Sequence, residues 1–127
     1  RASRAEEGLL GLLILNPDYL RTVSQKLSPD DMATAFNRSL YVRLLDRHRQ
    51  GLLIELAFLA ADYDADEMAY ISHMVQTARE GLQTPEQAME YVEIIRTEHS
   101  LSGLENPASL PDDTIQALLA AMREQKK

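Results

Sequence analysis

The apolar residues of this chain recur with the period of an α-helix, and capping signals separate one apolar segment from the next. Residues 9–15 read Leu-Leu-Gly-Leu-Leu-Ile-Leu, a run that is apolar on every side of a helical wheel and predicts a central, buried helix. Ser3 lies three residues before Glu6, the spacing of a capping box. Gly8 and Gly11 have no side chains, so one side of this helix would be thin enough for a neighbouring helix to approach closely. Periodicity alone also allows a strand over 9–15, but the preceding cap and the scarcity of β-branched residues favour a helix.

Capping signals of the same kind divide the rest of the chain into short helices. A capping residue followed by Pro or by an acidic residue opens each of them. The third helix should bury Asn37, Leu40, Tyr41, Leu44, Leu45 and His48. The elements predicted after the first helix are a helix from Asn16 to about 27, a turn at 28–31, a helix over 35–50 that ends at Gly51, a small helix over about 55–61, a helix over 64–80, a helix from Thr84 to about 99, a hinge or loop at about 100–111, and a last helix over 112–125.

The last predicted helix carries an apolar stripe formed by Ile115, Leu118, Leu119 and Met122. Two helices alone cannot enclose four large apolar side chains. The stripe therefore either packs back onto the preceding helix or enters a groove on a partner protein. The sequence predicts an all-α fold, with a compact helical bundle over residues 1–83 and a C-terminal helical hairpin over 84–127.

Composition narrows the class of protein. With 127 residues, of which 45% are hydrophobic, the chain can build one core. Its formal net charge of −7 disfavours a nucleic-acid scaffold, and the absence of Cys excludes disulfides and thiolate sites. No apolar run is long enough for a membrane span. Because the chain starts without Met, we expect it to be a fragment of a larger protein that ends near the native C-terminus.

The candidate chemical groups are few and scattered. His48, His73 and His99 fall on three different predicted helices without ligand-pair spacing, so we interpret His48 and His99 as partly buried, hydrogen-bonded side chains and His73 as exposed. The acidic residues at 62, 64, 66 and 67 lack the Gly and the final Glu of a calcium loop, and they suit helix capping. We therefore predict no catalytic residue, no metal and no cofactor.

Arginines at positions 38, 43, 47 and 49 make the third helix locally basic. Arg43 and Arg47 share one side of the helical wheel, and we expect no aromatic residues to alternate with them on that face. The simplest interpretation is a solvated helix face, with contact to a partner or to phosphate as the alternative. Direct DNA binding through this pair is disfavoured by the net charge.

Several apolar segments resemble the C-terminal helicase-binding domain of bacterial DnaG-type primases. Residues 7–17 are similar to the opening helix of that family, and the Arg-x-Leu-Tyr of residues 38–41 resembles the start of its third helix. The similarity continues through residues 27–32, 57–60 and 84–96 and covers nearly the whole chain. The N-terminal domain of the replicative helicase has the same six-helix bundle and a similar first helix, and it is the natural alternative.

The resemblance implies a non-catalytic module that recruits primase to the replication fork for RNA primer synthesis. Its partner would be the N-terminal collar of the hexameric replicative helicase in the bacterial cytoplasm, and the isolated module would be a monomer or a hairpin-swapped dimer. The partner-binding residues would be Ile115, Leu118, Leu119 and Met122 as apolar anchors, with Arg123 and Lys126 as rim charges. The helicase domain predicts self-association instead. A small α-helical enzyme or metal protein that uses His48 or His99 is a third alternative.

Overall fold

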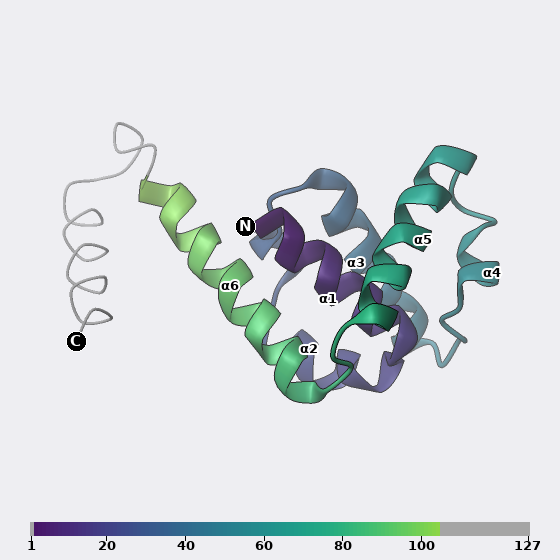
Figure 1. Cartoon of the computed structure of the whole chain (residues 1–127), viewed down its shortest axis with the longest axis horizontal. Coiled ribbons are helices and arrows are strands. Elements are labelled where there is room, and N and C mark those ends of the chain that lie inside the picture. Colours follow the sequence, from purple (N-terminus) through teal and green to yellow (C-terminus); the bar gives the residue numbers. More distant parts are fainter. Residues whose placement is uncertain (1, 105–127) are drawn as a thin grey trace.

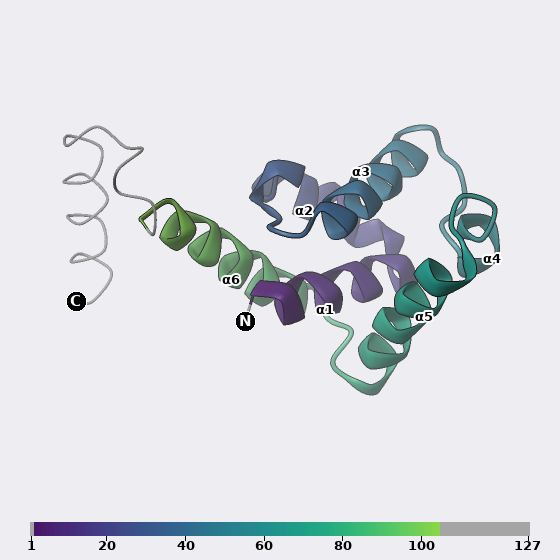
Figure 2. The same ribbon diagram turned by 90° about the horizontal axis from the view of Figure 1, so that it is seen from above.

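The first helix, α1 (Ala2–Leu15), forms the centre of the fold, as its all-round apolar sequence predicts. In the computed structural model, which describes residues 2–104, the four leucines between positions 9 and 13 are at most 1% exposed. Helices α3 (Ala35–Arg49), α5 (Ala65–Glu80) and α6 (Pro85–Leu104) all contact α1, as two perpendicular views show (Figure 1 and Figure 2). A helix without a polar side needs neighbours all round, and these three provide them.

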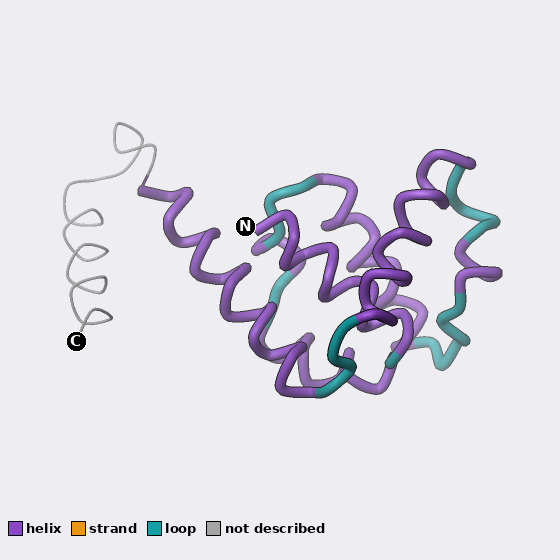
Figure 3. Tube along the Cα trace, in the orientation of Figure 1, coloured by secondary structure: helices purple, strands orange, loops and turns teal. Residues whose placement is uncertain are grey.

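Shorter elements connect the long helices. They are η1 (Pro17–Tyr19), α2 (Leu20–Lys26), η2 (Pro29–Asp31) and α4 (Leu56–Leu59). The part of the chain that the structure describes contains helices and loops but no strand (Figure 3). The predicted all-α bundle is thus confirmed, and residues 9–15 are helical, as the cap argument favoured. Helix α4 is shorter than the small helix predicted there.

Two glycines let the neighbouring helices approach α1 closely. A Cβ at Gly8 would lie 2.6 Å from Cζ of Tyr91, which reaches over from α6. A Cβ at Gly11 would press on the main-chain carbonyl of Met74 in α5, 2.6 Å from its carbon atom. Since real side chains do not pack at such distances, a Cβ at Gly11 would require the main chain of α5 to move, whereas at Gly8 the end of the Tyr91 side chain would have to shift. The thin side predicted from the glycine spacing is confirmed.

The capping boxes explain where two of the elements begin. Asp64 accepts a hydrogen bond from the Glu67 amide at 2.8 Å, and its own amide donates to the Glu67 carboxylate at 2.9 Å. Ser28 and Asp31 form the same reciprocal pair at the start of η2. These bonds satisfy backbone N–H groups that have no partner within the helix. Capping therefore accounts for Asp64 and Glu67 in the acidic run, as predicted.

The structure differs from the predicted elements at three boundaries. Ser3 lies inside α1 rather than before it, so the first capping box does not form. The Asn16 side chain donates back to the Leu12 carbonyl and does not cap the next turn. Helix α6 continues to Leu104, past the predicted break after residue 99. The Ser and Gly residues there lower helix propensity by only about 1 kcal/mol or less each, which does not interrupt a helix.

The remainder of the predicted hinge and the last predicted helix lie outside the described residues. The division of the chain into a bundle over 1–83 and a hairpin over 84–127 accordingly stays a prediction. Within the described part, α6 packs along α1 and also contacts α2. Its inner residues Ala88, Val92 and Ile95 belong to the same core as those of α1.

Tyr41 is among the largest fully buried side chains, and its hydroxyl donates to the Leu27 carbonyl at 2.8 Å. This bond joins the middle of α3 to the residue that ends α2. Burial raises the pKa of the Tyr41 hydroxyl far above its usual value, and the negative charge of Asp31 raises it further. The ring is thus a neutral, hydrogen-bonded part of the core.

Replacing Gly11 with Ala tests the close contact between α1 and α5. The new methyl group would collide with main-chain atoms of Met74, which cannot swing away as a side chain could. We expect the free energy of unfolding to fall by about 2 kcal/mol or more, although Ala favours a helix by up to about 1 kcal/mol. Urea denaturation followed by circular dichroism measures the change. Gly81→Ala is the control, since its Cβ would make only ordinary contacts, and an equal loss in both variants would contradict the argument.

Tyr41→Phe tests the buried hydroxyl. At pH 7 the variant should be less stable by about 1 kcal/mol, because the Leu27 carbonyl loses its donor. Above pH 10 tyrosine ionises in the unfolded chain while the raised pKa keeps Tyr41 neutral in the fold. Wild-type stability therefore falls as the pH rises, and the difference from the variant should narrow by about 1 kcal/mol between pH 10 and 11. Denaturation curves at both pH values measure it; parallel pH profiles would contradict the assignment.

Candidate interaction surfaces

A carboxylate is completely buried near the start of α1. Glu6 has no exposed surface, and its two oxygens accept hydrogen bonds from the Ala33 amide at 2.8 Å and from Nδ2 of Asn37 at 2.9 Å. The Tyr70 hydroxyl donates to Asn37 at 3.5 Å, and burial is the main reason why the pKa of Tyr70 is raised. Both oxygens of the buried carboxylate thus have partners within the protein, and the network holds α1 against α3.

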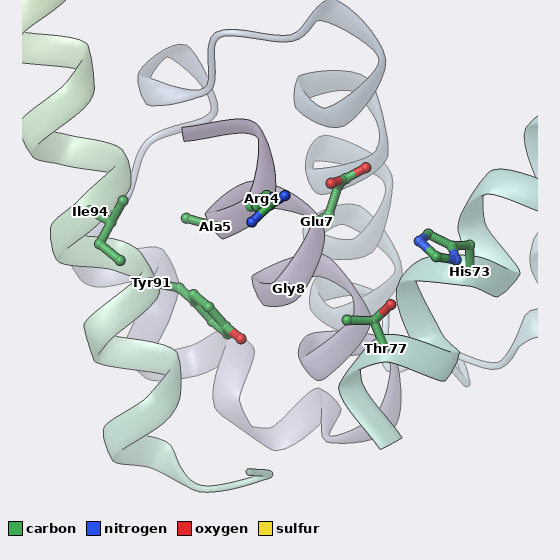
Figure 4. A pocket seen from close by; sticks show the side chains of 8 residues that line it. All are labelled: Arg4, Ala5, Glu7, Gly8, His73, Thr77, Tyr91 and Ile94. Atoms are coloured by element: carbon green, nitrogen blue, oxygen red, sulfur yellow. The ribbon is translucent and has the colours of Figure 1, made fainter. Parts of the chain in front are cut away.

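A groove of about 470 Å³ opens between α5 and α6. The first turns of α1 form its floor, and side chains from the other two helices reach over it (Figure 4). Gly8 keeps the floor low, while Tyr91 and Ile94 provide an apolar wall. The residues that line the groove are Arg4, Ala5, Glu7, Gly8, His73, Thr77, Tyr91 and Ile94.

The groove is a candidate surface for binding, because its lining combines an apolar wall with polar side chains from α1 and α5.

An arginine–aromatic row, formed by Phe36, Arg43, Arg47, Phe58 and Tyr63, covers the outer side of α3. The Arg43 guanidinium lies 5.3 Å from the centre of the Tyr63 ring, and that of Arg47 lies 5.6 Å from the Phe58 ring. The Phe36 and Tyr63 rings are in tilted contact at 5.6 Å. Such cation–π and aromatic contacts fix the segment after α3 against that helix.

The two arginines of the row have different polar partners. Arg43 donates to the Tyr63 hydroxyl at 3.2 Å and pairs with Asp62 at 3.2 Å. This hydrogen bond to Tyr63 is the main reason that the pKa of Arg43 is raised. Arg47 donates to the main-chain carbonyl of Leu53 at 2.8 Å. Arg43 is thus paired with an acid, whereas Arg47 bonds to a carbonyl that carries no net charge.

Exposed apolar side chains surround this row. Leu53 is 63% exposed, and Val42, Leu52 and Phe58 are between 40% and 47% exposed. We call these four residues, together with Arg43 and Arg47, the α3–α4 face. A cluster of exposed apolar residues around arginines is typical of protein contact surfaces. The face lies at the end of the molecule opposite to α6 (Figure 2).

The sequence located part of this face. It placed Arg43 and Arg47 on one side of α3, which the structure confirms, but it missed their aromatic partners. Phe58 and Tyr63 come from the following segment and fold back over the helix, so a helical wheel of α3 cannot reveal them. A local signal existed in the two consecutive leucines at 52 and 53, directly after Gly51, which adopts a left-handed φ of 71°.

The histidines only partly follow the predictions. His73 is exposed, as predicted, and lines the groove. His48 is exposed rather than partly buried, because Leu45 is the last buried residue of α3. The His99 side chain is half exposed, and its Nε2 lies 3.8 Å from an oxygen of Asp31. Within the described residues, no three His, Asp or Glu side chains gather as a metal site.

The six predicted partner-binding residues, Ile115, Leu118, Leu119, Met122, Arg123 and Lys126, all lie outside the described residues. Their role consequently stays a prediction. None of the helices within residues 2–104 combines the length and the apolar character that crossing a lipid bilayer requires.

Comparison with known proteins identifies the family to which this helical bundle belongs. Residues 1–97 match the family model of the DnaB-like helicase N-terminal domain. The matched residues contain α1 to α5 and most of α6. No curated protein matches the chain significantly.

This match overturns the expectation of a primase domain. The assignment to the helicase-binding domain of a DnaG-type primase is wrong, and so is the recruiting role that it implied. The residues that carried the resemblance are mostly core positions, such as Leu9, Leu13 and Leu40. Because the two domains have the same bundle, apolar core positions report the fold and do not separate the families. The alternative of a helicase N-terminal domain fits the match.

Glu6→Gln tests the buried polar network. The glutamine amide retains one acceptor oxygen, but its NH₂ group must face one of the two donors that the carboxylate now accepts. We expect the free energy of unfolding to fall by about 2 kcal/mol. The exposed Glu90 of α6 provides the control, since Glu90→Gln should change stability by less than about 0.5 kcal/mol. Thermal and urea unfolding measure both, and unchanged stability of Glu6→Gln would disprove the importance of the network.

Proposed function

This chain belongs to the DnaB-like helicase N-terminal domain family, and we propose that it is the non-catalytic assembly domain of a bacterial replicative helicase. Its role would be to associate with other copies of itself and so form the N-terminal collar of a hexamer. The single observation that carries the proposal is the match over residues 1–97, which includes the whole of the packed core around α1.

The nature of the described side chains supports this role. The buried polar groups Glu6, Asn37 and Tyr41 bond to other protein groups inside the bundle. Four large exposed apolar residues of the described part, all except Leu82, lie instead on the α3–α4 face, where another protein can cover them. A rigid core with an apolar outer face is what a domain needs when its function is contact between subunits.

The proposal also fixes the expected partners. They are first the other subunits of the same helicase and then further proteins of the replication machinery in the bacterial cytoplasm. We expect no cofactor, and the net charge of −7 disfavours DNA as a direct ligand of this domain. The earlier expectation of a monomer followed from the primase resemblance, and the helicase family favours self-association instead.

Sedimentation velocity of the full 127-residue chain tests the proposal. We expect the average mass to rise with concentration between about 5 and 500 μM, since a small domain contact is weak outside the complete helicase. A mass that stays that of the monomer over this range would contradict the assembly role. A Leu118→Asp/Leu119→Asp variant, checked for helicity by circular dichroism, measures in the same experiment whether the predicted terminal stripe contributes.

A further inference from the structure

The groove between α5 and α6 combines an apolar wall with a positive charge. Tyr91 and Ile94 of α6 form the wall, and both side chains are only partly buried by the described part of the bundle. Arg4 lines the groove from the start of α1, and it takes no part in the ion pairs among the described residues. The groove therefore suits a segment that carries apolar side chains together with an acidic group.

The lining residues also give the groove a direction. Arg4 and Ile94 lie toward one end, whereas Tyr91 and Thr77 lie toward the other (Figure 4). Between them the floor is bare, because Gly8 has no side chain and the end of the Tyr91 ring reaches over it. An occupant must accordingly place its acidic group at the Arg4 end and its apolar side chains beyond it.

The last predicted helix of this chain has its charged and apolar residues in that order. Asp112 and Asp113 open the helix, and its apolar stripe follows from Ile115 onward. A segment that turns back after α6 runs antiparallel to that helix. It thus reaches the Ile94 end of the groove first, with its two acidic residues in front of the stripe.

We propose that residues 112–122 fill the groove of their own chain, with the acidic pair at Arg4 and the apolar stripe against Tyr91 and Ile94. A short tether gives such a segment an effective concentration on the order of millimolar. At micromolar protein it therefore occupies the groove ahead of the same segment from a second copy.

The connection is long enough for this contact. The residues between Leu104 and Asp112 can span up to about 27 Å when extended. Ile94 lies ten residues before Leu104 in α6, which is about 15 Å back along the helix. The chain can therefore reverse after α6 and still bring the acidic pair to the groove.

In such a contact the groove and the stripe cover each other. The stripe cannot dock in the groove and contact another protein at the same time, so a partner that binds the stripe must displace it first. The inference goes beyond the assembly function and does not depend on it, because the docking takes place within one chain.

Cross-linking between two introduced cysteines tests the docking, since the chain itself contains no Cys. Thr77 lies on α5 and lines the groove, so a short bis-maleimide should join Thr77→Cys to Leu118→Cys within one chain. The matched control is Arg79→Cys with Leu118→Cys, because Arg79 lies on the same helix but lines a different hollow. At about 1 μM protein, the groove pair should react at least about tenfold faster than the control pair.

Mass spectrometry separates cross-linked single chains from products that join two chains, and circular dichroism with thermal melting establishes that both double variants fold. Equal rates for the groove pair and the control pair would overturn the proposed docking. A product that joins two chains in place of the intrachain product would overturn it as well. Either result leaves the assembly function standing, because sedimentation of the wild-type chain tests that function separately.

A charge reversal tests the orientation of the docked segment. In the Thr77→Cys/Leu118→Cys chain, Arg4→Glu should slow the intrachain reaction several-fold, since it brings a negative charge to the acidic pair. Arg21→Glu is the control, because Arg21 is also exposed but lies on α2, outside the groove. Equal rates in the two variants would overturn the placement of the acidic pair at Arg4.

Discussion

The close contact of α5 with α1 at Gly11 is the constraint on which the rest of the structure depends. Residues 9–15 of α1 are apolar on all sides of the helix and must be enclosed, but a helix with a full set of side chains keeps its neighbours apart. Gly11 lets the main chain of Met74 rest directly on α1, and Gly8 admits the ring of Tyr91 from α6. The enclosure of the core thus depends on two positions where side chains are absent.

Polar bonds then set how the remaining elements are placed around that centre. The buried Glu6 carboxylate fixes the start of α1 to Asn37 of α3 and to the Ala33 amide. Tyr41 joins α3 to the end of α2 in the same way. Hydrophobic burial has no direction, whereas a buried hydrogen bond is costly to leave unmade. These few bonds therefore specify one arrangement of helices that burial alone would only favour.

The buried polar groups of the bundle already have hydrogen-bond partners inside it, so the function of the domain depends on its surface. The described surface has an apolar groove between α5 and α6 and the α3–α4 face at the opposite end of the bundle from α6. The second gathers four exposed apolar residues around two arginines.

The sequence by itself determined the all-α fold, the central place of α1, the thin side at the two glycines, and the capping box at Asp64. Each of these follows from residues close together in the chain, where helical periodicity and capping act. It did not distinguish the helicase domain from the primase domain, because the residues that carried the resemblance are mostly apolar core positions, and such positions indicate a fold and not a family. Nor could it find the α3–α4 face. Phe58 and Tyr63 reach Arg47 and Arg43 only when the chain folds back over α3, so the tertiary structure alone decided that these residues form one surface.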